Sequence, residues 1–554
     1  MTASRVDNQT IAYSPTSSVR GIRHLAIASG TAAEYTTTSG TDATSVLCST
    51  ITDASPTHIG RLVEFLSGDN KGLRAICVAN QSGDLTVEEM PNTIASGVRF
   101  RILDCPAYVS VADSGGTTNW TDATLTESTN FFKDYYVRPI EATEAITDEM
   151  ARVTAHNAGT GALTVATFDA TVTANDVAIL ERPILAEDLT HEHPTDMIER
   201  NPIRDTNVPE QSIAGARRGG TVSFSLPLKG DNTGAGDSTD AWRWSSVIPL
   251  LEACFGTLTL DQGETVQAPG DVDGSTGTPL IVATDPASDD FTSGALCMVN
   301  GNAVPIELAA TAAAQLTLSG ALPDNAQTND IIYAGANIRY ASTGHYPIGC
   351  FEIWEDQVRY RYWSCYGTVT FSTDAAGRLM ANFSFQAQSW DSLDQSCPVT
   401  DVQKAYPDAD VEDIIARDTP VSLSATTAEA NATQVEVATF SLDPGLVVSA
   451  RPTTGGIEGS KSFLVTGCKP TFAMNPLKEN DTYDTSVVNQ TCYQLLAQFG
   501  SKPGNTVAFW MPKVQITSNG KEDAEGYMRN TIAGKAVVPA STDPLGEGIV
   551  ISFL

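Results

Sequence analysis

Strand-like patterns dominate the chain. Thr, Val, Ile, Phe and Tyr alternate with small polar residues, and Gly, Asn, Asp and Pro separate these runs, which is typical of short β-strands joined by turns. Clear examples are Gly220–Leu228, Gly367–Ser372 and Met380–Gln388. The pattern therefore predicts a mainly β protein with few helices.

Helical spacing occurs in only a few segments. Asp240–Phe255 and Thr485–Phe499 each have a polar start, apolar residues at helical spacing and a glycine directly after the last residue. Pro249 strains the middle of the first segment, so that helix is expected to begin later or to bend there. A weaker helical segment is Asp410–Arg417.

The order of elements is repeated in the two halves of the chain. Phe224–Lys229 (FSLPLK) resembles Phe472–Lys478 (FAMNPLK), and each ends a predicted strand. A polar loop and one of the two main helical segments follow each motif. This order predicts two copies of one β-rich domain, each with one helix packed on its sheet.

A hairpin pattern completes each copy of this long repeat. The first hairpin, Gly367–Trp390, is expected to turn at Asp374–Gly377. The second, Lys513–Val538, is expected to turn near Asn519-Gly520 or later, at Gly526.

A shorter repeat predicts small β-modules. A Leu-Thr-Val or Leu-Thr-Leu strand is followed, after about a dozen residues, by a turn and another apolar strand. The three copies are Asp84–Leu103, Ala162–Leu180 and Gln315–Tyr333. Each copy is expected to belong to a small meander or barrel.

These repeats predict a division of the chain into domains. Residues 1–190 are expected to form N-terminal β-modules, and residues 257–338 an inserted acidic β-module. The first repeated domain then comprises residues 191–256 and 339–400, and the second comprises residues 401–554.

Composition and charge exclude several classes of protein. The 554 residues carry a formal net charge of −33, with 41% apolar and 18% charged residues, which is a foldable composition. So negative a chain lacks the Lys and Arg needed to wrap nucleic acid. No run approaches the ~18 apolar residues of a membrane span, and the first residues show no apolar secretory segment.

The ten cysteines are scattered, without a C-x-x-C pair or clustered histidines. We therefore expect buried, reduced thiols in a protein that folds in the cytoplasm.

No catalytic motif stands out, and the sequence predicts neither an enzyme nor a cofactor or metal site. His191 and His193 are the closest histidine pair, but no third ligand follows from the sequence. The aromatic, Arg-rich segment Phe351–Tyr366 is more typical of a core or an interface than of a stacking platform for sugars or bases.

Four basic residues are candidates for contacts between subunits. Arg217 and Arg218 lie in a Gly-flanked loop, where a guanidinium suits a carboxylate of a neighbouring subunit or an anion. Lys229 and Lys478 end the two repeated Pro-Leu-Lys motifs.

Charge is also distributed unevenly. Between Arg243 and Arg339 there is no Lys or Arg, whereas eleven acidic residues lie in the same stretch. Such a stretch is either a solvated surface or one that repels another polyanion.

The chain resembles a tail tube (major tail) protein of a long-tailed bacteriophage. The resemblance rests on the doubled element order and on the segments Val358–Trp390 and Ser462–Pro476. It covers residues 200–554, and the residues before Thr190 match only as added β-modules. The chain is much longer than a single-domain tube subunit, which the doubled domain would explain.

The resemblance implies a structural virion protein that polymerises into stacked rings. With two tube domains per chain, three chains would close a ring of pseudo-sixfold symmetry, although the sequence leaves a ring of six chains open. The resemblance also implies assembly in the host cytoplasm around a tape-measure protein, with tail terminator and baseplate proteins as further partners. DNA would pass through an acidic channel without specific binding.

Three other functions remain open at this stage. One is another virion component, such as a tail terminator, a distal tail protein or a capsid decoration protein. Another is a secreted or surface β-sandwich adhesin. The third is a carbohydrate-active enzyme that uses acids near the aromatic segment.

Overall fold

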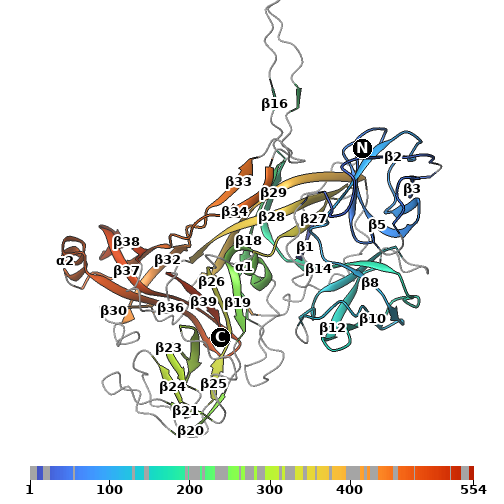
Figure 1. Ribbon diagram of the computed structural model, residues 1–554. Coiled ribbons are helices and arrows are strands. Elements are labelled where there is room, and N and C mark those ends of the chain that lie inside the picture. Colours follow the sequence, from blue (N-terminus) through green and yellow to red (C-terminus); the bar gives the residue numbers. More distant parts are fainter. Residues whose placement is uncertain are drawn as a thin grey trace, which may run out of the picture.

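The computed structural model confirms a mainly β fold with few helices (Figure 1). The structure describes residues 9–15, 25, 27–40, 42–53, 57–127, 131–141, 149–193, 197–198, 213–214, 219–230, 247–260, 264–268, 280–282, 294–310, 315–318, 331–340, 346–355, 358–373, 377–394, 412–416, 421–424, 434–452, 460–479, 481–524, 526–537 and 548–554.

Seven elements form a first unit. Its strands are antiparallel and lie in the order β1-β27-β28-β29-β18-β15. Their bounds are β1 Gln9–Pro15, β15 Glu187–Glu192, β18 Gly220–Pro227, α1 Val247–Phe255, β27 Gly349–Glu355, β28 Val358–Thr373 and β29 Met380–Asp394.

Seven further elements form a second unit with the same chain order. Its strands lie in the matching order β30-β36-β37-β38-β35-β32. Their bounds are β30 Val421–Ser424, β32 Val437–Asp443, β35 Thr471–Pro476, α2 Thr482–Asn489, β36 Cys492–Lys502, β37 Asn505–Ala524 and β38 Tyr527–Ala536. The order strand, helix and hairpin therefore occurs twice.

Two tryptophans show how closely the units correspond. Trp363 in β28 follows Tyr362, which lies opposite Phe351 of β27. Trp510 in β37 follows Phe509, which lies opposite Ala497 of β36. The same register in both units makes Phe351 and Ala497 equivalent positions.

The two units share one eight-stranded antiparallel sheet. The end of β28 pairs with β32, with Phe371 opposite Leu442, Ser372 opposite Ser441 and Thr373 opposite Phe440. The strand order across both units is therefore β15-β18-β29-β28-β32-β35-β38-β37.

One apolar core runs under both units. It contains Phe224 and Phe383 from the first unit and Phe440 and Phe499 from the second, all nearly fully buried. Each buried side chain of this size contributes about 1.5–3 kcal/mol, so the shared core binds the two units firmly together.

The first predicted helix is present as α1, and its residues before Val247 lie outside the described part. Pro249 is the third residue of this helix, where its missing N–H removes no intrahelical bond. Seven of its nine residues are buried against the sheet.

The second predicted helix was placed wrongly. The helix is Thr482–Asn489, it ends at Gln490 in the left-handed region (φ 54°), and Cys492–Lys502 is strand β36. That strand is buried along most of its length, and a continuous apolar run does not separate a buried strand from a helix.

The weaker helical segment Asp410–Arg417 is also wrong in its described part. Residues 412–416 are extended and bridge the ends of β18 and β29. The second hairpin turns at the later of its two predicted places, because β37 continues through Asn519-Gly520 and the turn contains Gly526.

All three copies of the shorter repeat contain the two expected strands. The pairs are β6 Asp84–Val87 with β7 Arg99–Leu103, β13 Ala162–Val165 with β14 Val177–Ile184, and β24 Gln315–Leu318 with β25 Ile331–Ala334.

Two modules follow β1 (Figure 1). The first contains a six-stranded sheet in the order β2-β7-β4-β5-β6-β3. The remaining bounds are β2 Tyr35–Thr36, β3 Ser45–Leu47, β4 Leu62–Phe65, β5 Arg74–Gln81, and, in the second module, β8 Val109–Val111, β9 Ser114–Gly115, β10 Asn119–Thr121, β11 Tyr136–Glu141 and β12 Ala151–Asn157. Residues 9–15 and 187–190 join the first unit although the sequence grouped them with the N-terminal modules.

A closed barrel is inserted between α1 and β27, in the order β20-β21-β24-β23-β22-β25. The strands β19 and β26 lead into and out of it, and the C-terminal β39 pairs with β26 and β37. The bounds are β19 Gly256–Leu260, β20 Glu264–Ala268, β21 Leu280–Val282, β22 Leu296–Val299, β23 Asn302–Ala310, β26 Ala336–Tyr340 and β39 Val550–Phe553.

Each unit also carries a two-stranded arm at the same place in its chain order. One arm contains β16 Met197–Ile198 and β17 Ile213–Ala214, between β15 and β18. The other contains β33 Val448–Pro452 and β34 Ser460–Val465, between β32 and β35.

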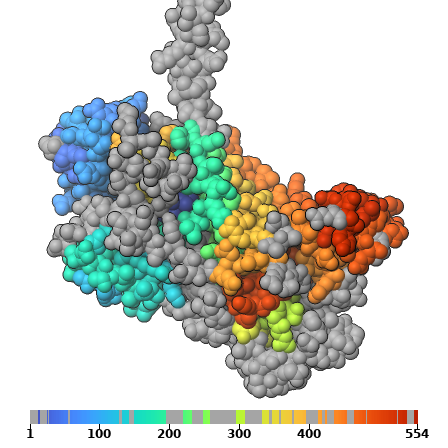
Figure 2. Space-filling model, turned by 180° about the vertical axis from the view of Figure 1, so that it is seen from behind, coloured from blue at the N-terminus to red at the C-terminus, as the bar shows by residue number. Residues whose placement is uncertain are grey.

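The N-terminal modules lie away from the end of the second unit that carries α2 (Figure 1). The N-terminal modules and the red-coloured end of the second unit occupy opposite sides of the molecule (Figure 2). No helix in the described ranges is long and apolar enough to cross a membrane.

Candidate assembly interface

The eight-stranded sheet has two outer strands, β15 and β37. Among the described strands, β15 pairs only with β18. Residues 516–524 of β37 pair with β38 and with no other described strand. Each open edge presents unpaired backbone groups and is a template for another strand. We call these surfaces the β15 edge and the β37 edge.

The β28–β32 joint inside the chain shows which residues correspond to the β37 edge. In the first unit, Leu226 lies opposite Ala381, and Ala381 lies opposite Phe371. In the second unit, the matching row is Met474, Ile532 and Asn519. Residues 519–521 of β37 therefore correspond to residues 371–373, which make the internal joint.

The β15 edge corresponds in the same way to β32. In the second unit, Leu442 of β32 lies opposite Phe472. Phe472 corresponds to Phe224 in the first unit. Residues 188–189 of β15 lie beside Phe224, because Glu187 pairs with Ser225 and Thr190 pairs with Ser223. Leu189 is therefore the counterpart of Leu442. Leu189 is half-buried, whereas Leu442 inside the joint is buried.

The β15 edge is acidic. It carries Glu187, Asp188 and Glu192. Glu187 accepts two hydrogen bonds from Arg378, at 2.6 and 2.9 Å, while Asp188 is exposed and has a positive φ of 53°. This strand thus exposes a carboxylate beside an open row of backbone groups.

The β37 edge carries a cluster of two lysines and one carboxylate. Lys521 and Lys478 lie 3.4 and 3.8 Å from Asp484 of α2. Lys521 lowers the pKa of Lys478, because the two ammonium groups are neighbours. The cluster has one excess positive charge and would gain from another carboxylate.

The exposed apolar residues near this edge distinguish α2 from α1. Val488 of α2 is 81% exposed, and Tyr527 at the start of β38 is 68% exposed. In contrast, α1 is almost wholly covered. The end of the second unit that carries α2 therefore exposes more apolar surface than the α1 region of the first unit does.

The four residues predicted to contact other subunits lie in different places. Arg217 and Arg218 lie outside the described residues. Lys229 is buried and pairs with Asp413 at 3.2 Å inside the same chain. The structure therefore brings Lys478 to an open edge and Lys229 to the linker segment between the units.

His191 and His193 form an aromatic cluster at the end of β15. Nδ1 of His191 lies 2.6 Å from the Tyr362 hydroxyl, and Nε2 lies 2.7 Å from Glu355. The His193 ring packs on Trp390 at 4.3 Å. Burial, and then His191, lower the pKa of His193.

Among the described residues, no group of His, Cys, Asp or Glu is arranged to hold a metal ion. The described part of the chain holds nine cysteines, all as free thiols: seven are buried, and Cys468 and Cys492 are half-buried. Cys397 lies outside the described residues.

One face of the eight-stranded sheet is covered by hydroxyl and amide side chains. It lies opposite the apolar core, because side chains alternate along each strand. Ser223 donates to Ser384 at 3.1 Å, and Ser225 donates to Asn382 at 2.8 Å. This hydroxyl face comprises Thr190, Thr221, Ser223, Ser225, Thr368, Thr370, Ser372, Asn382, Ser384, Gln386, Thr439, Ser441, Thr471, Asn475, Gln515 and Thr531.

Charged residues also occupy rows of this face. Glu187 lies opposite Ser225 and Glu192 opposite Thr221, and Asp443 and Lys535 lie on either side of Thr471. The described acids of the base-free stretch lie elsewhere: Glu252 in α1 and Glu264 in β20, with Glu307 in β23. The described acids of this stretch thus lie in α1 and the inserted barrel, and the other eight lie outside the described residues.

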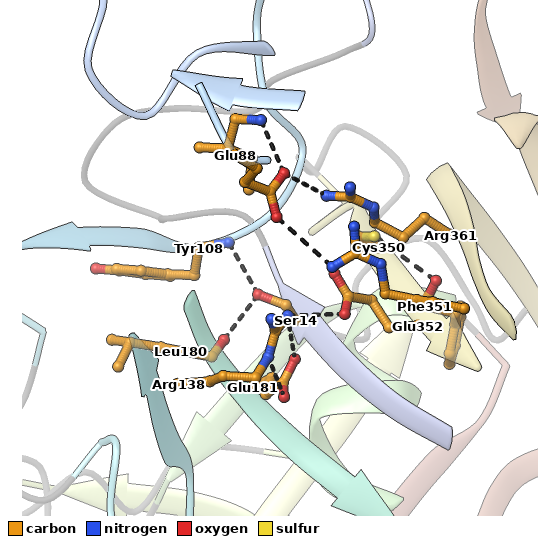
Figure 3. A network of polar contacts seen from close by, with 12 residues as sticks. Ser14, Glu88, Tyr108, Arg138, Leu180, Glu181, Cys350, Phe351, Glu352 and Arg361 are labelled. Atoms are coloured by element: carbon orange, nitrogen blue, oxygen red, sulfur yellow. Dashed lines mark hydrogen bonds and ion pairs between the residues drawn. The ribbon is translucent and has the colours of Figure 1, made fainter. Parts of the chain in front are cut away.

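A buried network of ion pairs attaches the first N-terminal module to the first unit (Figure 3). Glu88 accepts a hydrogen bond from Arg361 at 2.9 Å and lies 3.6 Å from Arg359. It also accepts the Ile76 N–H at 2.9 Å. Burial alone would raise the pKa of Glu88, but Arg361 and Arg359 lower it to about 2.

The second module is attached in a similar way (Figure 3). Arg138 donates to Glu181 at 2.9 Å and to Glu352 of β27 at 2.7 Å. Burial opposes the charge of Arg138, but Glu181 and Glu352 raise its pKa. The Ser14 hydroxyl donates to the Leu180 carbonyl at 2.7 Å.

Sequence reasoning missed both the open edges and this network. The edges depend on register, and a one-residue slip exchanges the two faces of a strand. Glu88 and Arg361 are 273 residues apart, so no local spacing joins them. A usable signal was the density of Arg in Phe351–Tyr366, which the sequence assigned to a core or an interface.

Comparison with known protein families finds no family model that matches this chain. Comparison with curated proteins finds no match either. The geometry of the repeat is therefore the basis for inferring a function.

Proposed function

We propose that this protein is a structural virion protein that polymerises into the tail tube of a long-tailed bacteriophage. The observation that supports this proposal is the incomplete joint at each end of the eight-stranded sheet. The β28–β32 joint inside the chain joins two equivalent units. The β37 edge and the β15 edge are the two halves of the same joint, left open.

Pairing of the β37 edge with the β15 edge of another copy would repeat the internal joint. By the pairs of the internal joint, Asn519 would lie opposite Leu189, Gly520 opposite Glu187 and Lys521 opposite Ala186. Asp188 is the extra residue of the bulge in β15, so Lys521 would come within one residue of Glu187 along the joint. Leu189 would become buried as its counterpart Leu442 is. The cluster of Lys478, Lys521 and Asp484 carries a charge opposite to that of Glu187 and Asp188 and favours this pairing. Glu522 and Asp523 follow the cluster on β37.

Closure of the sheet removes both edges. With eight strands in each chain, three chains would give 24 strands, which is the ring of pseudo-sixfold symmetry that the resemblance implies. A barrel of that size is about 50 Å across, from a strand spacing of ~4.8 Å and a tilt of ~40°. Such a channel is wider than a DNA duplex.

The hydroxyl face would line this channel. Neutral hydroxyl and amide groups make up most of this face, and the ammonium group of Lys535 lies in one row with the carboxylate of Asp443. Phosphates would therefore find few positive partners, so DNA would pass without being held. We therefore attribute the repulsion of DNA to the electrostatic field of the whole acidic chain rather than to a row of acidic side chains that line the channel. On this proposal, the tape-measure, tail terminator and baseplate proteins are partners of the channel and of its two ends.

The test combines electron microscopy with edge variants. The purified chain at high concentration should form hollow tubes with regular axial striations, with threefold averages of the rings. Asn519→Pro, which removes an outward-facing N–H, and Lys521→Glu should each abolish tubes and leave a folded monomer. Lys71→Glu, an exposed charge reversal in the first N-terminal module, is the matched control.

Two results would count against the proposal. One is a chain that stays monomeric across protein and salt concentrations, even when tail initiator proteins are added. The other is tubes that form equally well from the edge variants and the control, because the two edges would then not be the assembly surfaces.

A further inference from the structure

The ends of β18 and β29 are separated by a short segment of the linker between the units. The Leu228 N–H donates to the Leu379 carbonyl at 2.8 Å, but the return bond is replaced. Instead, the Leu379 N–H donates to the Ile414 carbonyl at 2.9 Å, and the Ile414 N–H donates to the Leu228 carbonyl at 3.0 Å. Ile414 is only 2% exposed, so this insertion seals the end of the first unit.

The second unit has the same open end without an inserted segment among the described residues. The Lys478 N–H donates to the Met528 carbonyl at 3.0 Å, and no return bond joins the Met528 N–H to Lys478. Since the N–H and C=O of a strand residue point to the same side, the Met528 N–H faces this gap. Met528 is 53% exposed, whereas Leu379 is fully buried.

The repeat identifies the segment that fits this gap. Tyr13 of β1 lies opposite Phe351, and Val421 of β30 lies opposite the equivalent Ala497. Ile414 precedes Val421 by seven residues (421 − 414 = 7). Seven residues before Tyr13 is Val6 (13 − 6 = 7), which is apolar and β-branched like Ile414.

We propose that residues 1–8 of a neighbouring copy insert between the ends of β35 and β38, with Val6 near Met528. The inference rests on the proposed tube, because the β37–β15 joint would place β1 of the next copy where β30 lies at the internal joint. The strands of the second unit are longer here, so the gap lies two residues beyond the counterpart of Leu379. An extended segment spans that difference with about 7 Å.

This insertion would have two consequences. The Met528 N–H and the Lys478 carbonyl would gain partners, and the exposed Tyr527 and Met528 side chains would be covered. Each copy would also hold its neighbour by an arm in addition to the strand joint.

The experiment is photo-crosslinking in assembled tubes. Benzoylphenylalanine replaces Tyr527, and a mixture of heavy- and light-isotope chains reveals links between copies. The expected product joins position 527 of one copy to residues 1–20 of another. The matched control places the same photo-label at Val447, which is 46% exposed and lies outside the gap.

The outcomes separate the insertion from the tube. Tubes that give the link at position 527, and lose it when residues 1–8 are deleted, support the insertion. Tubes that lack the link, or show it equally from Val447, overturn the insertion and leave the tube proposal standing. Absence of tubes, with initiator proteins present, overturns the tube proposal and the insertion that rests on it.

Discussion

Glu88→Gln should release the first N-terminal module from the first unit at neutral pH. Glu88 is buried, and it is bonded to Arg361 and to the Ile76 N–H. Glutamine keeps the shape but removes the charge that faces two buried guanidinium groups. Breaking a buried ion pair from one side leaves the other charge uncompensated.

The magnitude follows from the pKa. The ion pairs lower the pKa of Glu88 from 4.5 to about 2. At about 1.4 kcal/mol for each pKa unit, the ionised carboxylate contributes about 3 kcal/mol to the free energy of unfolding. Because the folded-state pKa is lowered, this contribution is complete above the ordinary pKa of 4.5 and is lost as the pH falls toward 2.

The assay is urea unfolding between pH 2 and pH 8, followed by tryptophan fluorescence, together with hydrogen exchange at the Ile76 amide. Glu88→Gln should lower the stability by about 3 kcal/mol at pH 7 and by little at pH 2. Glu89→Gln, at the exposed neighbouring position, is the control. An equal loss at both pH values, or a loss no greater than that of the control, would refute the role of the ion pairs.

Two further predictions concern other parts of the chain. Burial raises the pKa of Glu252 in α1 from 4.5 to about 7, so the folded state loses stability as the pH rises between these values; Glu252→Gln should add about 3 kcal/mol above pH 7 and flatten the profile of unfolding against pH. Trp510 packs against Leu296 and Met298 of the inserted barrel, so Trp510→Ala should cost about 3–5 kcal/mol; hydrogen exchange should rise in β22 and β23 and stay unchanged in β4.

The repeated order was predictable because its signals are local. The FSLPLK and FAMNPLK motifs sit where β18 and β35 end, and the shorter repeat marks its strands by spacing alone. The first helix was also predictable, since its amphipathic pattern begins beside Pro249, a residue tolerated in a first turn.

The errors have a different physical origin. Cys492–Lys502 is buried along most of its length, so its apolar run carries no period that separates strand from helix. Gln9–Pro15 joins the first unit through β27, more than three hundred residues away, and such pairing leaves no mark in the local sequence. The open edges are visible only when the register of both units is known.

The two units are covered by different modules, and this difference can explain why two units are joined in one chain. Trp363 is covered by residues of the N-terminal modules, including Leu62 and Ile76. Its counterpart Trp510 is covered by the inserted barrel. Both are buried, so each unit needs a cover at this position.

In a ring of single-unit chains, every cover would be identical. A fused pair can place two different modules in alternation around a wall built from equivalent strands. On the proposed tube, the wall would therefore keep pseudo-sixfold symmetry, while the appended modules would have only threefold symmetry. Ring averages that show sixfold density at every radius would be incompatible with this arrangement, because the N-terminal modules and the inserted barrel differ in strand order.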